Sequence, residues 1–145
     1  MRKIALLGLV IFLFLLVSCG PAEDELIEIE KTKIFISLDY PDEISSDQGF
    51  MVKATISNDL EFPITLSSMS FPFSDFKFNQ DVEISTNVEI PAGTTRSVEY
   101  NVERNMEAFF GSGLVSSMIQ FDVRVNDPKG ARDFSKREEL VIDIT

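Results

Sequence analysis

The side chains of this sequence that could do chemistry are few in kind. Cys19 is the only thiol among the 145 residues, and the chain has no histidine and no tryptophan. Without an imidazole there is no serine–histidine–aspartate triad and no histidine-ligated zinc. A lone cysteine forms no disulfide within the chain. Any catalysis would therefore depend on carboxylates, lysines, tyrosines and hydroxyls.

Carboxylates are concentrated in one polar segment that could bind a metal ion. Four acidic residues lie close together there: Asp39, Asp42, Glu43 and Asp47. Carboxylate oxygens are the ligands that calcium prefers, but this spacing matches no EF-hand loop. Acidic loops are usually just solvated, so we expect no metal and no cofactor, and calcium stays an alternative.

A second pair of carboxylates, Glu103 and Glu107, could act as general acid and general base. The chain holds 24 acidic residues, so pairs at such spacings arise by chance. We therefore predict a protein that is not an enzyme. A carboxylate-dependent glycan hydrolase, which needs two acids in a cleft, is kept as a third hypothesis.

The N-terminus has the layout of an export signal. Arg2 and Lys3 precede the apolar segment 4–17, which is 14 residues long. Signal peptides have apolar regions of about 7 to 15 residues, whereas a bilayer-spanning helix needs about 20. A signal peptide over residues 1–18 is therefore predicted, followed by a short polar linker over 19–25.

The end of this leader resembles the lipobox of bacterial lipoprotein precursors. The residues Leu16-Val17-Ser18-Cys19 place leucine at −3, small residues near the cut and cysteine at +1. The resemblance implies cleavage before Cys19 and a lipid on its sulfur. Two or three acyl chains hold a protein on a membrane far more firmly than one. Gly20 in place of aspartate favours, by analogy with enteric bacteria, the outer membrane over the inner one.

The charge of the chain limits its partners. Removing residues 1–18 leaves 127 residues with 11 basic and 24 acidic side chains, a net charge of −13. Nucleic acids and anionic lipid surfaces attract basic patches, so this acidity argues against both. A chain of this length forms one domain, which we place at residues 26–145. Because a disulfide is impossible, an apolar core must hold that domain.

Beyond residue 25, apolar residues recur with a period of two, which is typical of half-buried strands. The alternating segments are 27–30, 34–38, 50–57, 62–66, 82–90, 98–102, 119–125 and 140–144. The apolar residues change from odd-numbered to even-numbered positions across 31–33, which predicts a bulge or break between two strands there. Structural turn residues are predicted at Asn58, Pro63, Pro91 and Gly93. Pro63 donates no ladder hydrogen bond, so it is expected at an edge or bulge.

Two segments depart from this pattern. The segment 71–78 holds four phenylalanines, which are expected in the core, with an exposed patch for a partner or acyl chain as the alternative. In 105–115, Met106, Phe109, Phe110 and Leu114 recur at intervals near three and four, which predicts a short helix capped by Asn105. The expected fold is all-β: an immunoglobulin- or fibronectin III-like antiparallel β-sandwich of seven to eight strands with one short helix.

The order of these features resembles the type 2 late-embryogenesis-abundant domain, also called the WHy domain. The resemblance rests on the segment 58–66, which contains Asn58 and Pro63, and on the later turn 90–95. Asp59-Leu60 replaces the proline and asparagine of the family's hallmark turn. The family implies an Ig-like sandwich without catalytic residues, a role in desiccation or envelope stress, and a structural role for Asn58.

Together these features predict a membrane-anchored lipoprotein of the bacterial cell envelope. Its sandwich would bind or protect other molecules without catalysis, touching the membrane through the lipid on Cys19 and an envelope protein through an edge strand or loops. The alternative is an accessory or assembly factor of one particular envelope complex.

Overall fold

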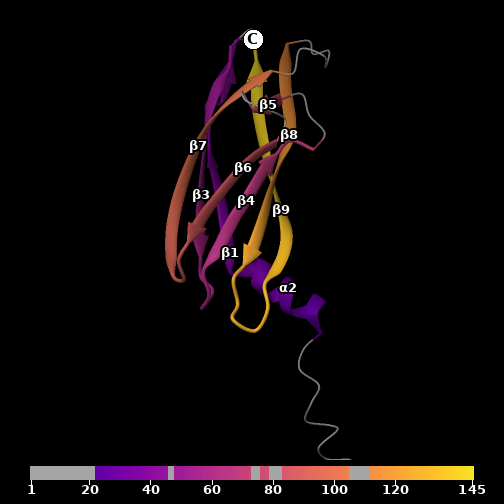
Figure 1. The fold of residues 1–145 in the computed structure, drawn as a ribbon. Helices are drawn as coiled ribbons and strands as arrows, with labels where there is room; N and C mark the ends of the chain where they lie inside the picture. The colour runs from indigo at the N-terminus through magenta and orange to yellow at the C-terminus, as the bar shows by residue number, and fades with distance from the viewer. Residues whose placement is uncertain (1–21, 46–47, 73–75, 79–82, 105–111) are drawn as a thin grey trace, which may run out of the picture.

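The computed structural model describes residues 22–45, 48–72, 76–78, 83–104 and 112–145. They form two packed β-sheets with one helix, α2 (Glu23–Thr32), at one end of the sandwich (Figure 1). The C-terminus lies at the opposite end. This architecture confirms the predicted all-β, Ig-like sandwich.

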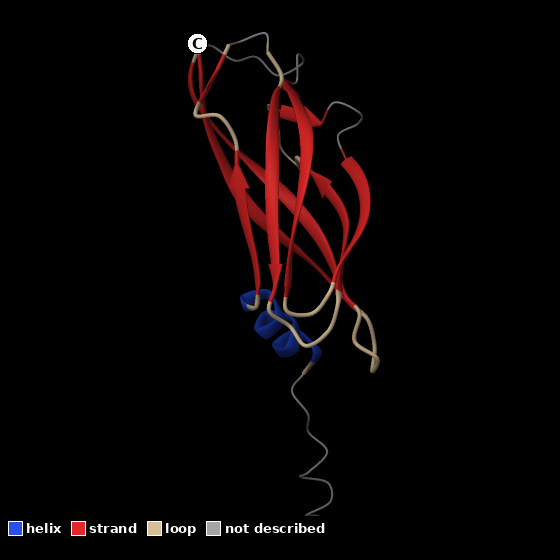
Figure 2. Ribbon diagram, turned by 90° about the vertical axis from the view of Figure 1, so that its left-hand side faces the viewer, coloured by secondary structure: helices blue, strands red, loops and turns tan. Residues whose placement is uncertain are grey.

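The sheets contain four and five strands. The four-stranded sheet has the order β1-β3-β7-β5, and the five-stranded sheet has the order β2-β9-β8-β4-β6. The strands are β1 (Ile34–Asp39), β2 (Glu43–Ile44), β3 (Phe50–Asn58), β4 (Ile64–Ser70), β5 (Phe76–Phe78), β6 (Glu83–Ile90), β7 (Thr94–Arg104), β8 (Gly113–Val125) and β9 (Arg132–Ile144). All pairings are antiparallel except that of the two-residue β2 with β9. Figure 2 shows the strands lying along the long axis of the sandwich, with α2 at one end.

Alternation in the sequence becomes alternation of burial. In β3, the side chains of Phe50, Val52, Ala54 and Ile56 are buried, and the intervening ones face solvent. Successive side chains of a strand point to opposite faces, so this pattern places one face of each sheet in the core. The largest fully buried side chains are Phe71, Phe76, Phe121, Ile34, Ile56, Ile64, Leu66, Met69, Ile90, Ile119 and Leu140.

The aromatic segment contributes to the core, as expected. Phe71 is 1% exposed and Phe76 is fully buried. The ring of Phe76 meets that of Phe50 edge-on, with centroids 5.4 Å apart, and lies 6.2 Å from that of Phe71. Edge-to-face pairs at this distance add attraction beyond area burial. Phe73 and the side chain of Phe78 lie outside the described residues.

The predicted strand at 27–30 is wrong, because this segment belongs to α2. Alternation over only four residues is weak evidence for a strand, and on the helix Ile29 is 51% exposed while Glu30 is buried. Acidic residues fill the first turn of α2 and Lys31 lies in its last turn, an arrangement that favours the helix dipole. The parity change at 31–33 is thus the end of a helix and not a bulge. The helix begins at Glu23, inside the segment predicted as linker.

The predicted helix over 105–115 is wrong at its C-terminal end. Residues 105–111 lie outside the described residues, and β8 begins at Gly113. The side chain of Leu114 is 75% exposed on that strand. The closing strand β9 is also longer than predicted, because it begins at Arg132 and pairs with β8 along its whole length. The first half of β9 is mostly polar, so apolar alternation in the sequence did not predict it.

Candidate functional site

A buried ion-pair network attaches α2 to the sandwich. Arg132, the first residue of β9, donates from Nε to both carboxylate oxygens of Glu30 at 3.0 and 3.1 Å, and from Nη2 to Glu30 Oε1. Its Nη2 also donates to Asp127 Oδ2 at 2.9 Å. The Arg132 side chain is 11% exposed, and each carboxylate side chain is 8% exposed. A guanidinium suits such planar, two-sided contacts.

These contacts raise the pKa of Arg132, through the hydrogen bond to Glu30 first and the one to Asp127 second. The pKa of Asp127 is lowered, first by the hydrogen bond from the backbone N–H of Lys129 and then by Arg132. Arg132 and Asp127 are therefore both charged at neutral pH. The network is a structural connection and offers no group for proton transfer.

Two further residues of β9 contact the same helix. Lys136 donates from Nζ to the carbonyl oxygens of Lys31, at 3.4 Å, and of Ile34. The Lys31 ammonium lies 5.8 Å from the ring centroid of Phe134. Arg132, Phe134 and Lys136 alternate along β9 and so share one side of the strand. We call these three residues the α2 seat.

Asn58, one of the predicted turn residues, is a hydrogen-bond centre at the same end of the sandwich. It is fully buried at the end of β3. Its Nδ2 donates to the carbonyl oxygens of Phe62 at 2.9 Å and Ile90 at 3.1 Å, and its Oδ1 accepts from Leu60 N–H at 3.1 Å. A third acceptor is Pro91 O at 3.3 Å. Because β3 and β6 belong to different sheets, this amide joins the two layers.

The other predicted turn residues lie nearby. Pro91 and Gly93 form the connection between β6 and β7, where Thr94 donates from its backbone N–H to Pro91 O at 3.2 Å. Gly93 has a φ of +66°, which favours glycine. Pro63 immediately precedes β4, and its carbonyl oxygen accepts from Asn126 N–H at 2.9 Å. Cys19 lies outside the described residues.

The outer face of the four-stranded sheet carries hydroxyl groups in two adjacent rows. Its register aligns Ser37, Thr55 and Ser97, and then Phe35, Ser57 and Thr95. Thr55 Oγ1 and Ser97 Oγ are 2.9 Å apart, and Thr95 Oγ1 donates to Ser57 Oγ at 3.1 Å. Cross-strand hydroxyl pairs are a common way to stabilise a solvated face.

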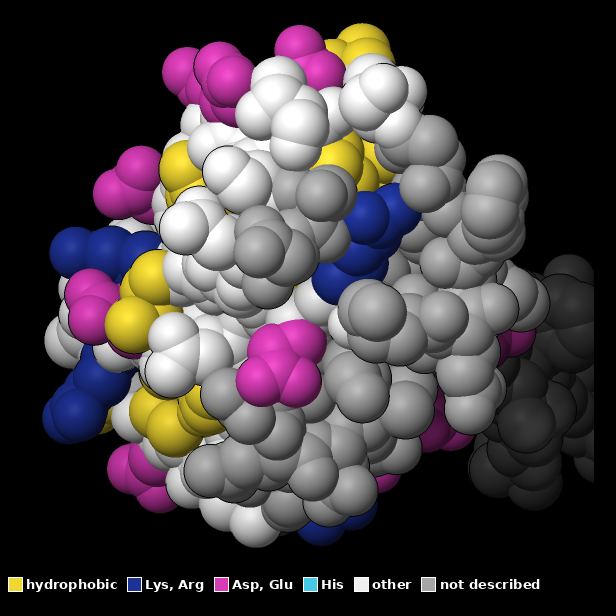
Figure 3. All heavy atoms as spheres, turned by 90° about the horizontal axis from the view of Figure 1, so that it is seen from above, with side chains coloured by type: hydrophobic (Ala, Val, Ile, Leu, Met, Phe, Trp, Pro, Cys, Tyr) yellow, Lys and Arg dark blue, Asp and Glu magenta, His cyan; other side chains and the backbone are white. Residues whose placement is uncertain are grey.

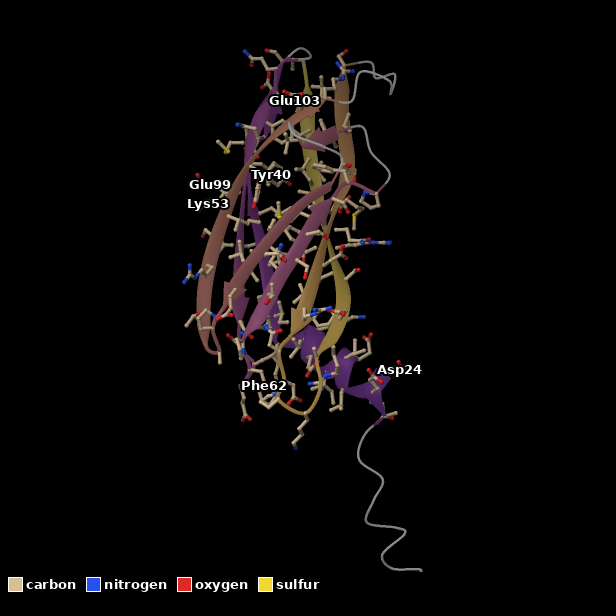
Figure 4. The ribbon with its side chains drawn as sticks, in the orientation of Figure 1. Asp24, Tyr40, Lys53, Phe62, Glu99 and Glu103 are labelled. Atoms are coloured by element: carbon tan, nitrogen blue, oxygen red, sulfur yellow. The ribbon has the colours of Figure 1, made fainter. Side chains whose placement is uncertain are left out.

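A shallow groove of about 460 Å³ follows on this face, lined by Asp39, Tyr40, Pro41, Met51, Lys53 and Glu99. Lys53 lies between Asp39 and Glu99 in the register, with its Nζ 3.8 Å from Glu99 Oε1. Figure 4 shows Lys53 and Glu99 along one margin of the ribbon. The Tyr40 hydroxyl accepts from Val141 N–H at 3.0 Å, so this ring connects the end of β1 to β9.

The outer face of the five-stranded sheet is organised around Asp122. Its carboxylate accepts from Ser68 at 2.7 Å, Ser135 at 2.6 Å and Gln120 at 3.1 Å. Burial opposes the charged form, but the hydrogen bonds outweigh it and the pKa of Asp122 is lowered. A carboxylate with three donors is stabilised as an anion and is a poor general base. This cluster connects β4, β8 and β9.

Within the described residues, the acidic side chains predicted as possible calcium ligands form no cluster. In the described ranges, no three histidine, cysteine or acidic residues lie close enough to hold a metal ion. Asp42 instead accepts at its carbonyl oxygen from Asp143 N–H. Asp47 and Glu107 lie outside the described residues, and Glu103 is half-buried on β7. Seen end-on from the side opposite α2, acidic and basic side chains are scattered (Figure 3).

Sequence reasoning missed the α2 seat. Glu30 and Arg132 are 102 positions apart, and no short motif links them. The sequence did contain one indication of it. Arg132 and Lys136 occupy the same alternate positions of β9 as the core residues Leu140 and Ile142, and so lie on the same side of the strand. A basic residue on the core-facing side of a strand indicates a buried partner. In the described part of the chain, no helix is long and apolar enough to cross a bilayer.

No protein-family model matches the sequence, and no curated protein matches it. Solved structures share the fold. Native α-2-macroglobulin of Escherichia coli matches with a TM-score of 0.56 and 16% identity over 78% of this chain. A crystal structure of the same protein, from domain MG7 to the C-terminus, matches with a TM-score of 0.57 and 17% identity over 77% of this chain. Salmonella α-2-macroglobulin reacted with methylamine matches with a TM-score of 0.54 and 14% identity over 77% of this chain.

This chain spans 7% of the first and third macroglobulin chains and 16% of the second. At these identities the likeness establishes the fold alone. The protein is thus a β-sandwich module of the same general fold as domains of much larger chains.

Proposed function

We propose that this protein is a lipid-anchored, non-catalytic β-sandwich module that binds other molecules in the bacterial cell envelope. The observation that carries the proposal is the attachment of α2 at one end of the sandwich by the buried Glu30–Arg132–Asp127 network. Because α2 begins four residues after Cys19, a lipid on that cysteine would lie within about 14 Å of the helix. The anchor and the folded body would then be mechanically coupled.

The remaining surface supports binding more than catalysis. The outer face of the four-stranded sheet combines hydroxyl rows with a shallow groove, and its exposed side chains include Phe35 at 55% and Met51 at 47%. Polar groups beside exposed apolar ones are typical of contact surfaces. The Asp122 carboxylate already accepts three hydrogen bonds, which makes it a poor general base.

The direct test is the chemistry of residue 19 in a bacterial host. The expected mature protein begins at Cys19, carries a diacylglyceryl mass and sediments with membranes. A Cys19→Ala variant should keep the same fold and lose membrane association. Mass spectrometry that finds a free thiol, or a chain that still begins at Met1, would contradict the anchor.

The binding role is tested separately by affinity capture from the native envelope, with the Cys19→Ala variant as the control. One stoichiometric partner would favour an accessory or assembly factor. Protection of many enzymes during drying, with no single partner, would favour the stress role that the WHy resemblance implies. Turnover of glycan substrates would contradict a non-catalytic module.

A further inference from the structure

Polar contacts provide most of the attachment of α2 to the α2 seat. Glu30 is the only buried residue of α2, Ile29 is 51% exposed, and Ile27 packs against the core while only partly buried. The connections to β9 are an ion pair, a lysine–carbonyl contact and a lysine above an aromatic ring. A helix of 10 residues is marginal in isolation, and α2 has no side-chain N-cap. Its order therefore depends on the seat.

The sandwich keeps its own partners for the seat when the helix is absent. Arg132 also donates to Asp127 Oδ2 at 2.9 Å and to Gly130 O at 3.3 Å, both in the β8–β9 connection. Lys136 also donates to Ile34 O, which belongs to β1. Departure of α2 would leave no buried cation without an acceptor, and Glu30 would move into water. This avoids the large penalty of stranding a buried charge.

The chain has a defined hinge next to the helix. Lys33 follows α2, and its carbonyl oxygen accepts from Asp59 N–H at 2.9 Å, which ties this residue to the β3–β4 connection. The next residue, Ile34, is fully buried at the start of β1. A release of α2 would therefore stop at Lys33 and leave the sheets intact.

From these observations we propose that α2 is a releasable tether segment with a docked and a released position, controlled by the Glu30–Arg132 contact. The docked position holds the N-terminal chain against the end of the sandwich. The released position uncovers Phe134 and the side chain of Arg132. It also turns the 13 residues between Cys19 and Lys33 into free chain, with an extended reach of about 50 Å.

The consequence for reach rests on the proposed lipid at Cys19, but the two positions do not. A docked lipoprotein would hold its sandwich close to the membrane. A released one would let the sandwich search a larger volume for its partner. A molecule that competes with α2 for Arg132 and Phe134, such as an acidic amphipathic segment of a partner, would favour release of α2 by mass action.

The test measures the distance between two labels on the mature chain. Thiols are introduced by Asp24→Cys on α2 and Glu99→Cys on the four-stranded sheet, in a Cys19→Ser background (both positions are labelled in Figure 4). Electron paramagnetic resonance should give one narrow distance distribution for this chain. Adding Glu30→Ala should raise a longer, broad component by about tenfold or more, since a charge-assisted hydrogen-bonded contact is lost.

The matched control is Glu28→Ala, which removes a carboxylate from the same helix. Glu28 is 73% exposed and pairs only with Lys31 of α2 in the described contacts, so its distribution should stay narrow. The melting temperature of the sandwich should barely change in either variant. Two results would overturn the proposal: a narrow distribution in Glu30→Ala, or unfolding of the sandwich together with the helix.

Membrane reach is measured separately with the lipidated protein in phosphatidylethanolamine–phosphatidylglycerol vesicles. Energy transfer from a label at position 99 to a dye in the bilayer should fall in Glu30→Ala and not in Glu28→Ala. If Cys19 carries no lipid, this signal is absent for every variant while the label-pair distances still report release. Failure of the anchor and failure of the releasable segment are thus distinguishable.

Discussion

The two ends of this sandwich are stabilised by different means. Near α2, buried polar side chains join elements that are distant in sequence, through Arg132 with its two carboxylates and through Asn58 with its three carbonyl acceptors. Farther from α2, rings pack in an apolar cluster around Phe76. Apolar burial is strong and non-directional, whereas hydrogen bonds specify which groups meet.

This difference predicts that substitutions in the apolar cluster change mainly stability, and that substitutions near α2 also change the arrangement of elements.

The largest effect is expected for Phe76→Ala. The ring is fully buried and contacts Phe50 and Phe71, so its removal leaves a cavity among rigid neighbours. Phe-to-Ala changes in cores cost about 3–5 kcal/mol. Urea unfolding should show this loss, with the structure of the α2 end retained. Phe35→Ala is the matched control, because its ring is 55% exposed and should change stability little. If both variants lost the same free energy of unfolding, the apolar cluster around Phe76 would not be a special source of stability.

Asn58→Ala should rank second. It leaves Leu60 N–H and the carbonyl oxygens of Ile90 and Phe62 without the amide that bonds them. Unsatisfied buried groups cost about 1–3 kcal/mol each, so a total of about 2–3 kcal/mol is expected, because Pro91 and its neighbours retain some access to water. The backbone amides of the β3–β4 and β6–β7 connections should exchange faster with solvent. Asn101→Ala, on the exposed face of β7, is the control. Unchanged exchange at both connections would contradict the layer-joining role.

Acid should weaken the protein through aspartates that are ionised in contacts. The pKa values of Asp127, Asp122 and Asp133 are lowered, and that of Asp133 is lowered mainly by the hydrogen bond from Arg124. A lowered folded-state pKa means that the stabilisation is complete above the ordinary aspartate pKa of about 3.9 and is lost as pH falls through the folded-state values. Chemical denaturation between pH 6 and 2 should show stability falling mostly below about pH 4.

The matched variant for this experiment is Asp122→Asn, which should flatten part of that acid dependence. A loss of stability that begins well above pH 5 would point to other groups.

The smallest effect is expected for Ser117→Ala. Ser117 is 5% exposed on the core-facing side of β8, and its hydroxyl has no hydrogen-bond partner within the described residues. Removing an unsatisfied buried hydroxyl is neutral or stabilising by up to about 1 kcal/mol. Ser68→Ala is the control, because it removes a 2.7 Å hydrogen bond to Asp122 and should destabilise. A clear loss of stability in Ser117→Ala would show that its hydroxyl has a partner such as a bound water.

Long, strongly alternating segments could be predicted from the sequence. The segments 50–57 and 119–125 lie within β3 and β8 with the expected side chains buried, because a period of two has one physical explanation in a half-buried strand. Short or weakly apolar segments could not. Alternation over the four residues 27–30 was too short to predict their structure, and the start of β9 is held by its pairing with β8.

By itself, the sequence determined the class of the fold and the limits on its chemistry, since alternation and residue types are local properties of the chain. It carries too little histidine and cysteine for the common catalytic and metal sites. Only the tertiary structure decided which residues meet. Glu30 and Arg132, or Asn58 and the Ile90 carbonyl, become neighbours because sheet packing brings together segments that no local pattern relates.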